Sequence, residues 1–288
     1  MLNMETEELE QKYKLVKQKC NSDAKSDETG DAILGLVETS LEFLKGCKTK
    51  VLESKVEGKH YEAFQNGGKE VISRPFRKDL FLKKFDETKS FWEEWKSGQI
   101  SGKNLESLVY TVALAPCLAM ELFNRQNKKG PATFFECYVS HLFSRALDVN
   151  PSKRAKLNLG NNTEVSMTMD FIFEKDRVHL PVKMSSRERV VQAWAHQRIL
   201  DVCYGEKPFR GIMVLFSETK LDSRSLEVVE ICVPDQWLAY QKLLSRMHRI
   251  YYFDIPSRYK QLSERHPDEI AIKQFTDFFI EKEEVLRS

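Results

Sequence analysis

The spacing of apolar residues predicts helices in the first half of the chain. Apolar positions recur there with a period near 3.6, as on the buried face of a helix. Helices are expected over 33–44, 79–97, 105–124 and 132–147. The segment SGQISGK, 97–103, is a plausible linker between the second and third of these helices. The sequence therefore predicts an all-helical N-terminal domain over 1–104.

After residue 150 the period of the apolar residues changes to two, which is typical of strands. Strands are expected over 157–159, 164–174, 178–184, 211–217 and 250–255, with 226–233 either a further buried strand or the start of a helix. Helices are expected over 187–204 and 267–286. This order predicts an α/β fold over 105–288, with a mixed central sheet and flanking helices.

The two strands 164–174 and 178–184 bring an acid and a lysine to one face. Apolar side chains occupy the odd positions of the first strand, so Asp170 points to its other face. With a two-residue turn at 175–176, position 170 lies opposite Pro181, and Lys183 lies diagonally across from Asp170. An Asp and a Lys so placed can hold a divalent metal and orient an attacking water. The alternative interpretation is a solvent-facing ion pair.

Three charged residues follow this lysine: Arg187, Glu188 and Arg189. Arginine binds guanine with two hydrogen bonds in the major groove, and glutamate accepts one from cytosine. The cluster could thus address adjacent G·C pairs, and a twofold dimer would address a palindrome. The other interpretation is a solvated first turn of the following helix.

Glu136 stands among aromatic and aliphatic residues of the helix predicted over 132–147. A carboxylate on an apolar helix face is costly unless it is paired or bound to a metal. Glu136 can equally lie at the edge of that face and reach water. The metal interpretation requires Glu136 to approach Asp170.

Composition narrows the class of protein. The chain has 45 Lys and Arg against 43 Asp and Glu, a net charge of +2, so no global field points to a nucleic acid or membrane. No run of apolar residues approaches the roughly 18 that a membrane helix needs. The six cysteines are scattered and form no C-x-x-C pair, which favours reduced thiols. We therefore expect a soluble intracellular protein without a membrane partner.

Taken in order, the motifs resemble a known family. Glu136 in its FFE helix, Asp170, Pro181-Val-Lys183 and the cluster 187–189 are similar to the PD-(D/E)XK nucleases, over about 130–255. Within them, the sequence resembles the type II restriction endonucleases that recognise CCGG, CCNGG or CCWGG.

The resemblance implies a restriction-endonuclease-like PD-(D/E)XK core, and a Mg²⁺-dependent enzyme that cleaves double-stranded DNA at a short palindrome with a CCGG core. It implies a homodimer or higher oligomer, in the cytoplasm of a prokaryote. The N-terminal domain over 1–104 would then aid dimerisation or clamp DNA. Alternatives are a CCNGG or CCWGG site, or a catalytically silent module that binds DNA sequence-specifically. Binding without cleavage would be one consequence of the departures described next.

The resemblance also assigns roles to residues. Asp170 would bind the metal, Lys183 would orient the water, and Arg187, Glu188 and Arg189 would recognise C·G pairs. Gln126, in a basic turn before the Glu136 helix, lies where relatives place a glutamine that contacts the minor groove. A turn that contacts phosphates and a solvated loop are the alternatives for Gln126.

This sequence departs from the family at the second acid. Pro181 occupies the usual position of that acid, two residues before Lys183. Some relatives carry the acid on the next helix, 13 residues after the lysine, where this chain has His196 followed by Gln197. Either of these residues, or Glu136, is expected to complete the metal site.

Overall fold

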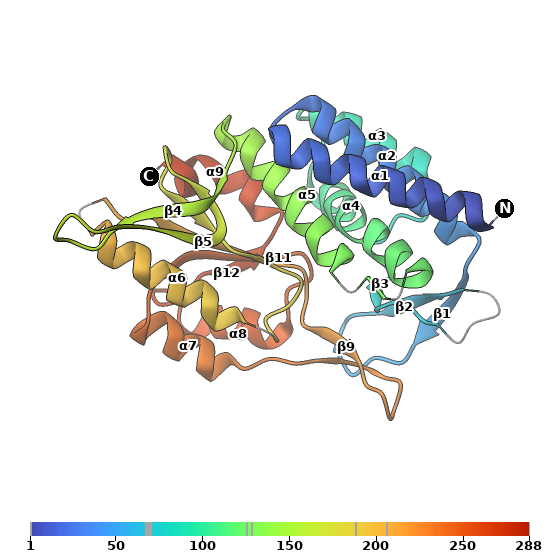
Figure 1. The fold of residues 1–288 in the computed structure, drawn as a ribbon. Coiled ribbons are helices and arrows are strands. Elements are labelled where there is room, and N and C mark those ends of the chain that lie inside the picture. Colours follow the sequence, from blue (N-terminus) through green and yellow to red (C-terminus); the bar gives the residue numbers. More distant parts are fainter. Residues whose placement is uncertain are drawn as a thin grey trace. The chain divides into compact units, whose positions relative to one another are not determined.

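Helices form the first part of the chain, as the apolar spacing predicts. The computed structural model describes residues 2–66, 71–124, 126–127, 129–187, 189–205 and 207–287. The helices are α1 (Leu2–Asp23), α2 (Asp27–Lys45), α3 (Phe85–Lys96), α4 (Gly102–Phe123) and α5 (Gly130–Leu147). Helix α2 packs against α1, α3 and α4 (Figure 1). The Ser26 hydroxyl caps α2 by accepting a hydrogen bond from the Thr29 N–H.

Helix α4 is the apolar centre of this helical group. It is long and apolar enough to cross a membrane by length and composition, yet 89% of its most apolar window is buried inside the protein. A helix that is apolar on all sides is typical of a protein core as well as of a membrane. The burial favours the core helix.

Strands interrupt the N-terminal region, so the prediction of an all-helical domain over 1–104 was wrong. Antiparallel strands β1 (Lys48–Leu52), β2 (Tyr61–Gln65) and β3 (Phe76–Arg77) form a small sheet. A hairpin of β9 (Thr219–Leu221) and β10 (Val228–Glu230) joins it through a bridge between Ser54 and Val228. The small sheet is stabilised by burial of side chains from both parts of the sequence, a long-range contact that local periodicity does not reveal.

A mixed sheet forms the second part of the chain, and this prediction is confirmed. Its strand order is β12-β11-β8-β6-β5-β4, with β7 beside β8. The strands are β4 (Ser152–Asn158), β5 (Glu164–Phe173), β6 (Val178–Leu180), β7 (Val182–Lys183), β8 (Arg210–Leu215), β11 (Met247–Tyr252) and β12 (Ile272–Gln274). Strands β12, β11, β8 and β6 run parallel, whereas β5 and β4 are antiparallel to their neighbours.

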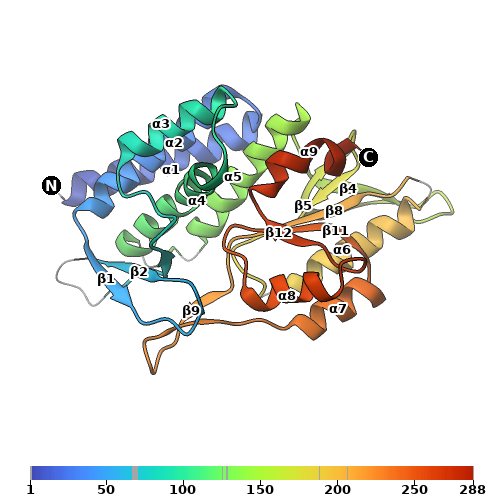
Figure 2. The same cartoon turned by 180° about the vertical axis from the view of Figure 1, so that it is seen from behind.

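Helices cover both faces of this sheet (Figure 2). Helices α6 (Val190–Cys203), α7 (Pro234–Leu243) and α8 (Ser257–Arg265) share one core with β8 and β11. Helix α9 (Asp277–Arg287) packs on the other face, where Phe278 lies against the Tyr251 ring. The alternation of side chains along β11 explains the division, since Tyr252 belongs to the first core and Tyr251 to the second face.

Three predicted elements differ from the structure. Helix α6 begins at Val190 rather than at 187, because residues 186–189 form turns where they are described. The segment 226–233 contributes the short strand β10, outside the mixed sheet. The tail 267–286 first adds β12 to the sheet and only then becomes helical, because β12 pairs with the buried strand β11.

The chain divides into two compact units. The first comprises Met1–His141 with Thr219–Glu230, and the second comprises Leu142–Glu218 with Ile231–Ser288. The β9–β10 hairpin thus belongs with the helices, and the division falls within α5. The functional boundary at residue 104 stays a prediction.

Gly211 on β8 is a position where an added side chain would press on two packed neighbours. A Cβ atom there would lie 2.6 Å from Gln197 Oε1 and 2.6 Å from Met247 Sδ. We expect Gly211→Ala to lower the free energy of unfolding by about 1–3 kcal/mol, since overpacking forces both neighbours to move. Urea denaturation followed by circular dichroism measures this change.

The matched control is Gly35→Ala on α2, where an added Cβ meets open space. We expect this variant to be as stable as the wild type or more stable by about 1 kcal/mol, because alanine favours a helix. Equal stability of the Gly211 and Gly35 variants would contradict the packing argument.

Candidate functional site

The register of the β5–β6 hairpin places Asp170 at the end of a ladder. Phe173 pairs with Val178, Ile172 with His179 and Phe171 with Leu180, the register predicted from the sequence. Asp170 is thus the first residue of β5 beyond the last pair with β6. Strand alternation directs its side chain to the face that also carries His179.

Pro181 separates β6 from β7. Proline has no N–H to donate to a ladder, although the Pro181 carbonyl accepts a hydrogen bond of 2.8 Å from the Val214 N–H of β8. Beyond it, β7 pairs with β8 through Val182 and Lys183. Pro181, which occupies the position expected for the acid, therefore lies between two short strands that both pair with β8.

An ion pair joins Asp170 and Lys183. Lys183 Nζ donates to Asp170 Oδ1 at 2.7 Å, and the two side chains are 21% and 18% exposed. Partial burial shields the pair from solvent, so its attraction exceeds that of a pair on the open surface. The second carboxylate oxygen, Oδ2, is available for a further ligand.

His179 is fully buried on β6, where Gln197 of α6 fixes its ring. Gln197 Nε2 donates to the Phe209 carbonyl at 2.6 Å and to Asp201 Oδ1 at 2.8 Å, so its Oε1 is the acceptor for His179 Nδ1 at 2.9 Å. The proton of His179 thus resides on Nδ1. Its Nε2 is buried and has no hydrogen-bond partner among the described residues.

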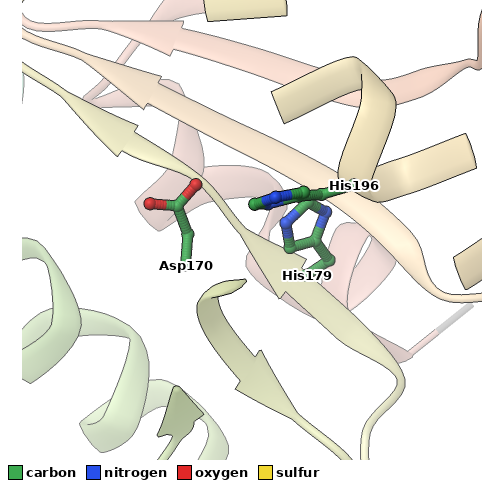
Figure 3. A group of neighbouring side chains, drawn as sticks. All are labelled: Asp170, His179 and His196. Atoms are coloured by element: carbon green, nitrogen blue, oxygen red, sulfur yellow. The ribbon is translucent and has the colours of Figure 1, made fainter. Parts of the chain in front are cut away.

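His196 of α6 completes a group with Asp170 and His179 (Figure 3). One ligand atom of each residue lies within 4.8 Å of the others, which is close enough for the three to hold one metal ion. Like His179, His196 has a buried ring nitrogen, Nδ1, without a hydrogen-bond partner in the described part of the chain. Of the two residues expected on α6, His196 therefore lies in the group, whereas Gln197 supports His179.

Burial keeps both imidazoles neutral. It lowers the pKa of His179 to about 4, against a smaller opposing effect of the Gln197 hydrogen bond. Burial also lowers the pKa of His196, opposed by the nearby Asp170 carboxylate. A neutral imidazole is the form that binds metals.

The arginines predicted to recognise bases lie in the segment before α6. Arg187 and Arg189 are exposed, whereas Glu188 lies outside the described residues. Arg187 Nε donates to Ser185 Oγ at 3.2 Å. Arg189 precedes the first residue of α6 in a left-handed conformation, with φ of 57°. Contact of these exposed side chains with DNA bases stays a prediction.

Glu218, which the sequence interpretation missed, links the segment before α6 to the sheet by hydrogen bonds. It is fully buried after β8, and its Oε1 accepts hydrogen bonds from the Ser186 N–H at 2.8 Å and the Tyr252 hydroxyl at 2.7 Å. Burial raises its pKa to about 7, although both hydrogen bonds oppose the shift. Its signal in the sequence is a charged residue directly after a continuous apolar strand.

The other two predicted residues lie in the first compact unit. Glu136 is half-buried on α5. Gln126 is exposed in the turn between α4 and α5, and its basic neighbours Arg125 and Lys128 lie outside the described residues. The approach of Glu136 to Asp170 and the DNA contact of Gln126 stay predictions.

The sequence interpretation also missed His179, which showed no ligand spacing along the chain. The hairpin register contained the signal, because it pairs position 179 with 172 and so places His179 on the face of Asp170. In the predicted hairpin, the alternation of side chains already places His179 on the same face as Asp170.

Comparisons with known proteins identify the fold. The structure is similar to the crystal structure of the type IIP restriction endonuclease Kpn2I, with a TM-score of 0.76 and 24% sequence identity. The alignment covers 95% of this chain and 96% of that chain. No family model and no curated protein matches the sequence. The chain thus has the fold of a type II restriction endonuclease.

Glu218 gives a prediction about pH and stability. Its pKa rises from 4.5 to about 7 on folding, so the unfolded chain releases this proton at lower pH than the folded chain. The contribution of protonated Glu218 to the free energy of unfolding is therefore complete below pH 4.5 and is lost as the pH rises to about 7. We expect the wild type to lose on the order of 3 kcal/mol relative to Glu218→Gln over this range.

Urea denaturation at several pH values measures this difference. Glu264→Gln, which changes an exposed carboxylate on α8, is the control and should leave the pH dependence of the wild type unchanged. Parallel stability curves for the wild type and Glu218→Gln would refute the role of burial.

Proposed function

We propose that this protein is a metal-dependent endonuclease that cleaves both strands of DNA at a short palindrome with a CCGG core. The observation that carries the proposal is the Asp170–Lys183 ion pair of 2.7 Å, held where the β5–β6 ladder ends. The fold shared with a type II restriction endonuclease supports it. The proposed enzyme acts as a homodimer, because cleavage of two DNA strands requires two active sites. We place it in the cytoplasm, where its DNA substrate would be.

The two residues divide the chemical work. The Lys183 ammonium orients the attacking water and stabilises the negative charge that develops on the phosphate oxygens as water attacks phosphorus. Asp170 holds Lys183 through Oδ1 and offers Oδ2 to a metal. A bound divalent ion would supply Lewis-acid activation of the phosphate and lower the pKa of its bound water.

The donors around Asp170 fit Mg²⁺ poorly. Mg²⁺ prefers six oxygen ligands, whereas the group described here offers one carboxylate and two imidazoles. Imidazole suits transition-metal ions better. The sequence predicts a different site, in which Asp170 and Glu136 bind Mg²⁺. That prediction is separate from the group of Asp170, His179 and His196 in Figure 3.

DNA cleavage tests the proposed active site. We expect purified protein with a divalent ion to cut plasmid DNA into discrete fragments whose ends share a C/G palindrome. Asp170→Ala and Lys183→Ala should each slow cleavage by about 100-fold or more, the usual effect of losing electrostatic stabilisation of a transition state. Gel assays with Mg²⁺, Mn²⁺ or EDTA, followed by sequencing of the ends, give both results.

The matched control removes an ion pair of the same type elsewhere. Lys242→Ala breaks the surface pair with Glu269, at 2.9 Å, and should leave the cleavage rate unchanged. Wild-type rates in the Asp170 or Lys183 variant would exclude these residues from catalysis.

Recognition of C·G pairs is assigned to Arg187, Glu188 and Arg189. Arg189→Ala should reduce discrimination between a CCGG duplex and one with a substituted C·G pair by about 1–3 kcal/mol, because a two-bond contact to guanine is lost. Competition binding of cleavage-deficient Asp170→Ala protein measures the change.

Arg265→Ala, at an exposed arginine of α8, serves as the control and should preserve discrimination. An equal loss of affinity for all duplexes in the Arg189 variant would instead make Arg189 a phosphate contact.

A second candidate function is a catalytically silent module that binds DNA sequence-specifically. Pro181 favours it, because it stands where the acid is expected and the group around Asp170 holds one carboxylate. Specific binding of CCGG duplexes that stay intact with every divalent ion would establish this alternative. Specificity for CCNGG or CCWGG would appear directly in the sequenced ends.

A further inference from the structure

Three side chains from three elements converge beside the Asp170–Lys183 pair. Asp170 comes from β5, His179 from β6 and His196 from α6 (Figure 3). Their ligand atoms lie within 4.8 Å of one another, and both histidines are buried. Such convergence of separate elements on one point is expected of a binding site.

Each histidine of this group has one buried ring nitrogen without a hydrogen-bond partner among the described residues. His179 Nδ1 is engaged by Gln197, which leaves the lone pair of Nε2, and Nε2 is buried with no partner among the described residues. His196 Nδ1 is likewise buried and without a partner within the described chain, whereas its Nε2 lies 3.4 Å from Gln192 Nε2. A buried polar atom without a partner costs about 1–3 kcal/mol, so two beside one carboxylate point to a ligand that is bound there.

The arrangement around His179 is that of a supported metal ligand. Histidines that bind metals generally donate their other ring N–H to a fixed acceptor, which sets the tautomer and the orientation of the ring. Gln197 Oε1 is that acceptor, and its own amide is held by the Phe209 carbonyl and Asp201. Gly211 leaves the space that the Gln197 amide occupies.

The chemistry of the donors selects the ion. Two imidazole nitrogens and one carboxylate on a shared site suit first-row transition metals, whereas Mg²⁺ requires oxygen ligands. We propose that Asp170, His179 and His196 bind one first-row transition-metal ion, of the Zn²⁺ and Co²⁺ class, in preference to Mg²⁺. Metal binding by these three residues does not depend on the proposed function, whereas the use of this ion in DNA cleavage rests on it.

Cobalt provides a direct probe of this site, because its visible absorption reports the ligands. The full chain, stripped of metal with EDTA and dialysed, is titrated with Co²⁺. We expect ligand-field bands that saturate at one ion per chain and that persist in about 100-fold excess of Mg²⁺. Absence of the bands, or their loss at comparable Mg²⁺ concentrations, would overturn the proposal.

Variants assign the ligands. His196→Gln and His179→Gln should each lower Co²⁺ affinity by about 100-fold or more, and Gln197→Ala by about 10–100-fold as a positioning residue. His248→Gln changes a half-buried histidine of β11 outside the group and should bind Co²⁺ like the wild type. Circular dichroism confirms that each variant is folded, and His196→Gln is the decisive one because His179 is more deeply buried. Unchanged affinity in folded His196→Gln protein would refute the site.

The titration requires no DNA, so it fails or succeeds independently of nuclease activity. Co²⁺ binding at these residues in a protein that leaves CCGG duplexes intact would support the metal site and refute the proposed function. Cleavage that persists in His196→Gln protein unable to bind Co²⁺ would refute the use of this ion in cleavage and support the nuclease.

Discussion

The pairing register of the β5–β6 hairpin is the constraint on which the site depends. Strand side chains alternate between faces, so this register places Asp170 and His179 on one face, together with Lys183 beyond the Pro181 break. A shift by one residue would move the members of one strand to the opposite face. Phe171 and Phe173 are buried on the other face and Ile172 on this one, so such a shift would disrupt the packing of both faces.

Packing of α6 supplies the rest of the group. Ala193 and Trp194 are buried in the core that α6 shares with β8 and β11, and this contact fixes the rotation of the helix. Three and four residues after Ala193, the same helix face carries His196 and Gln197 toward β6. The packing of α6 in this core therefore also fixes the positions of His196 and Gln197 in the site.

The segment that carries the arginines is tied to the sheet by hydrogen bonds of Glu218. Its carboxylate joins the backbone of Ser186 to the Tyr252 hydroxyl on β11, so the start of the exposed arginine segment is held to a rigid element. A binding segment benefits from such support, because less conformational freedom is lost when a partner binds. The burial that raises the pKa of Glu218 thus belongs to the scaffold of the proposed recognition surface.

The sequence by itself determined the mixed sheet, the hairpin register and the pairing of Asp170 with Lys183, because alternation and turn length are local properties. It did not reveal the strands β1–β3, whose burial depends on the distant hairpin of β9 and β10. It also did not reveal His179 as a neighbour of His196 or Glu218 as the acceptor for Ser186. Tertiary structure decided these contacts, since they join residues of separate elements and become favourable only when folding brings those elements together.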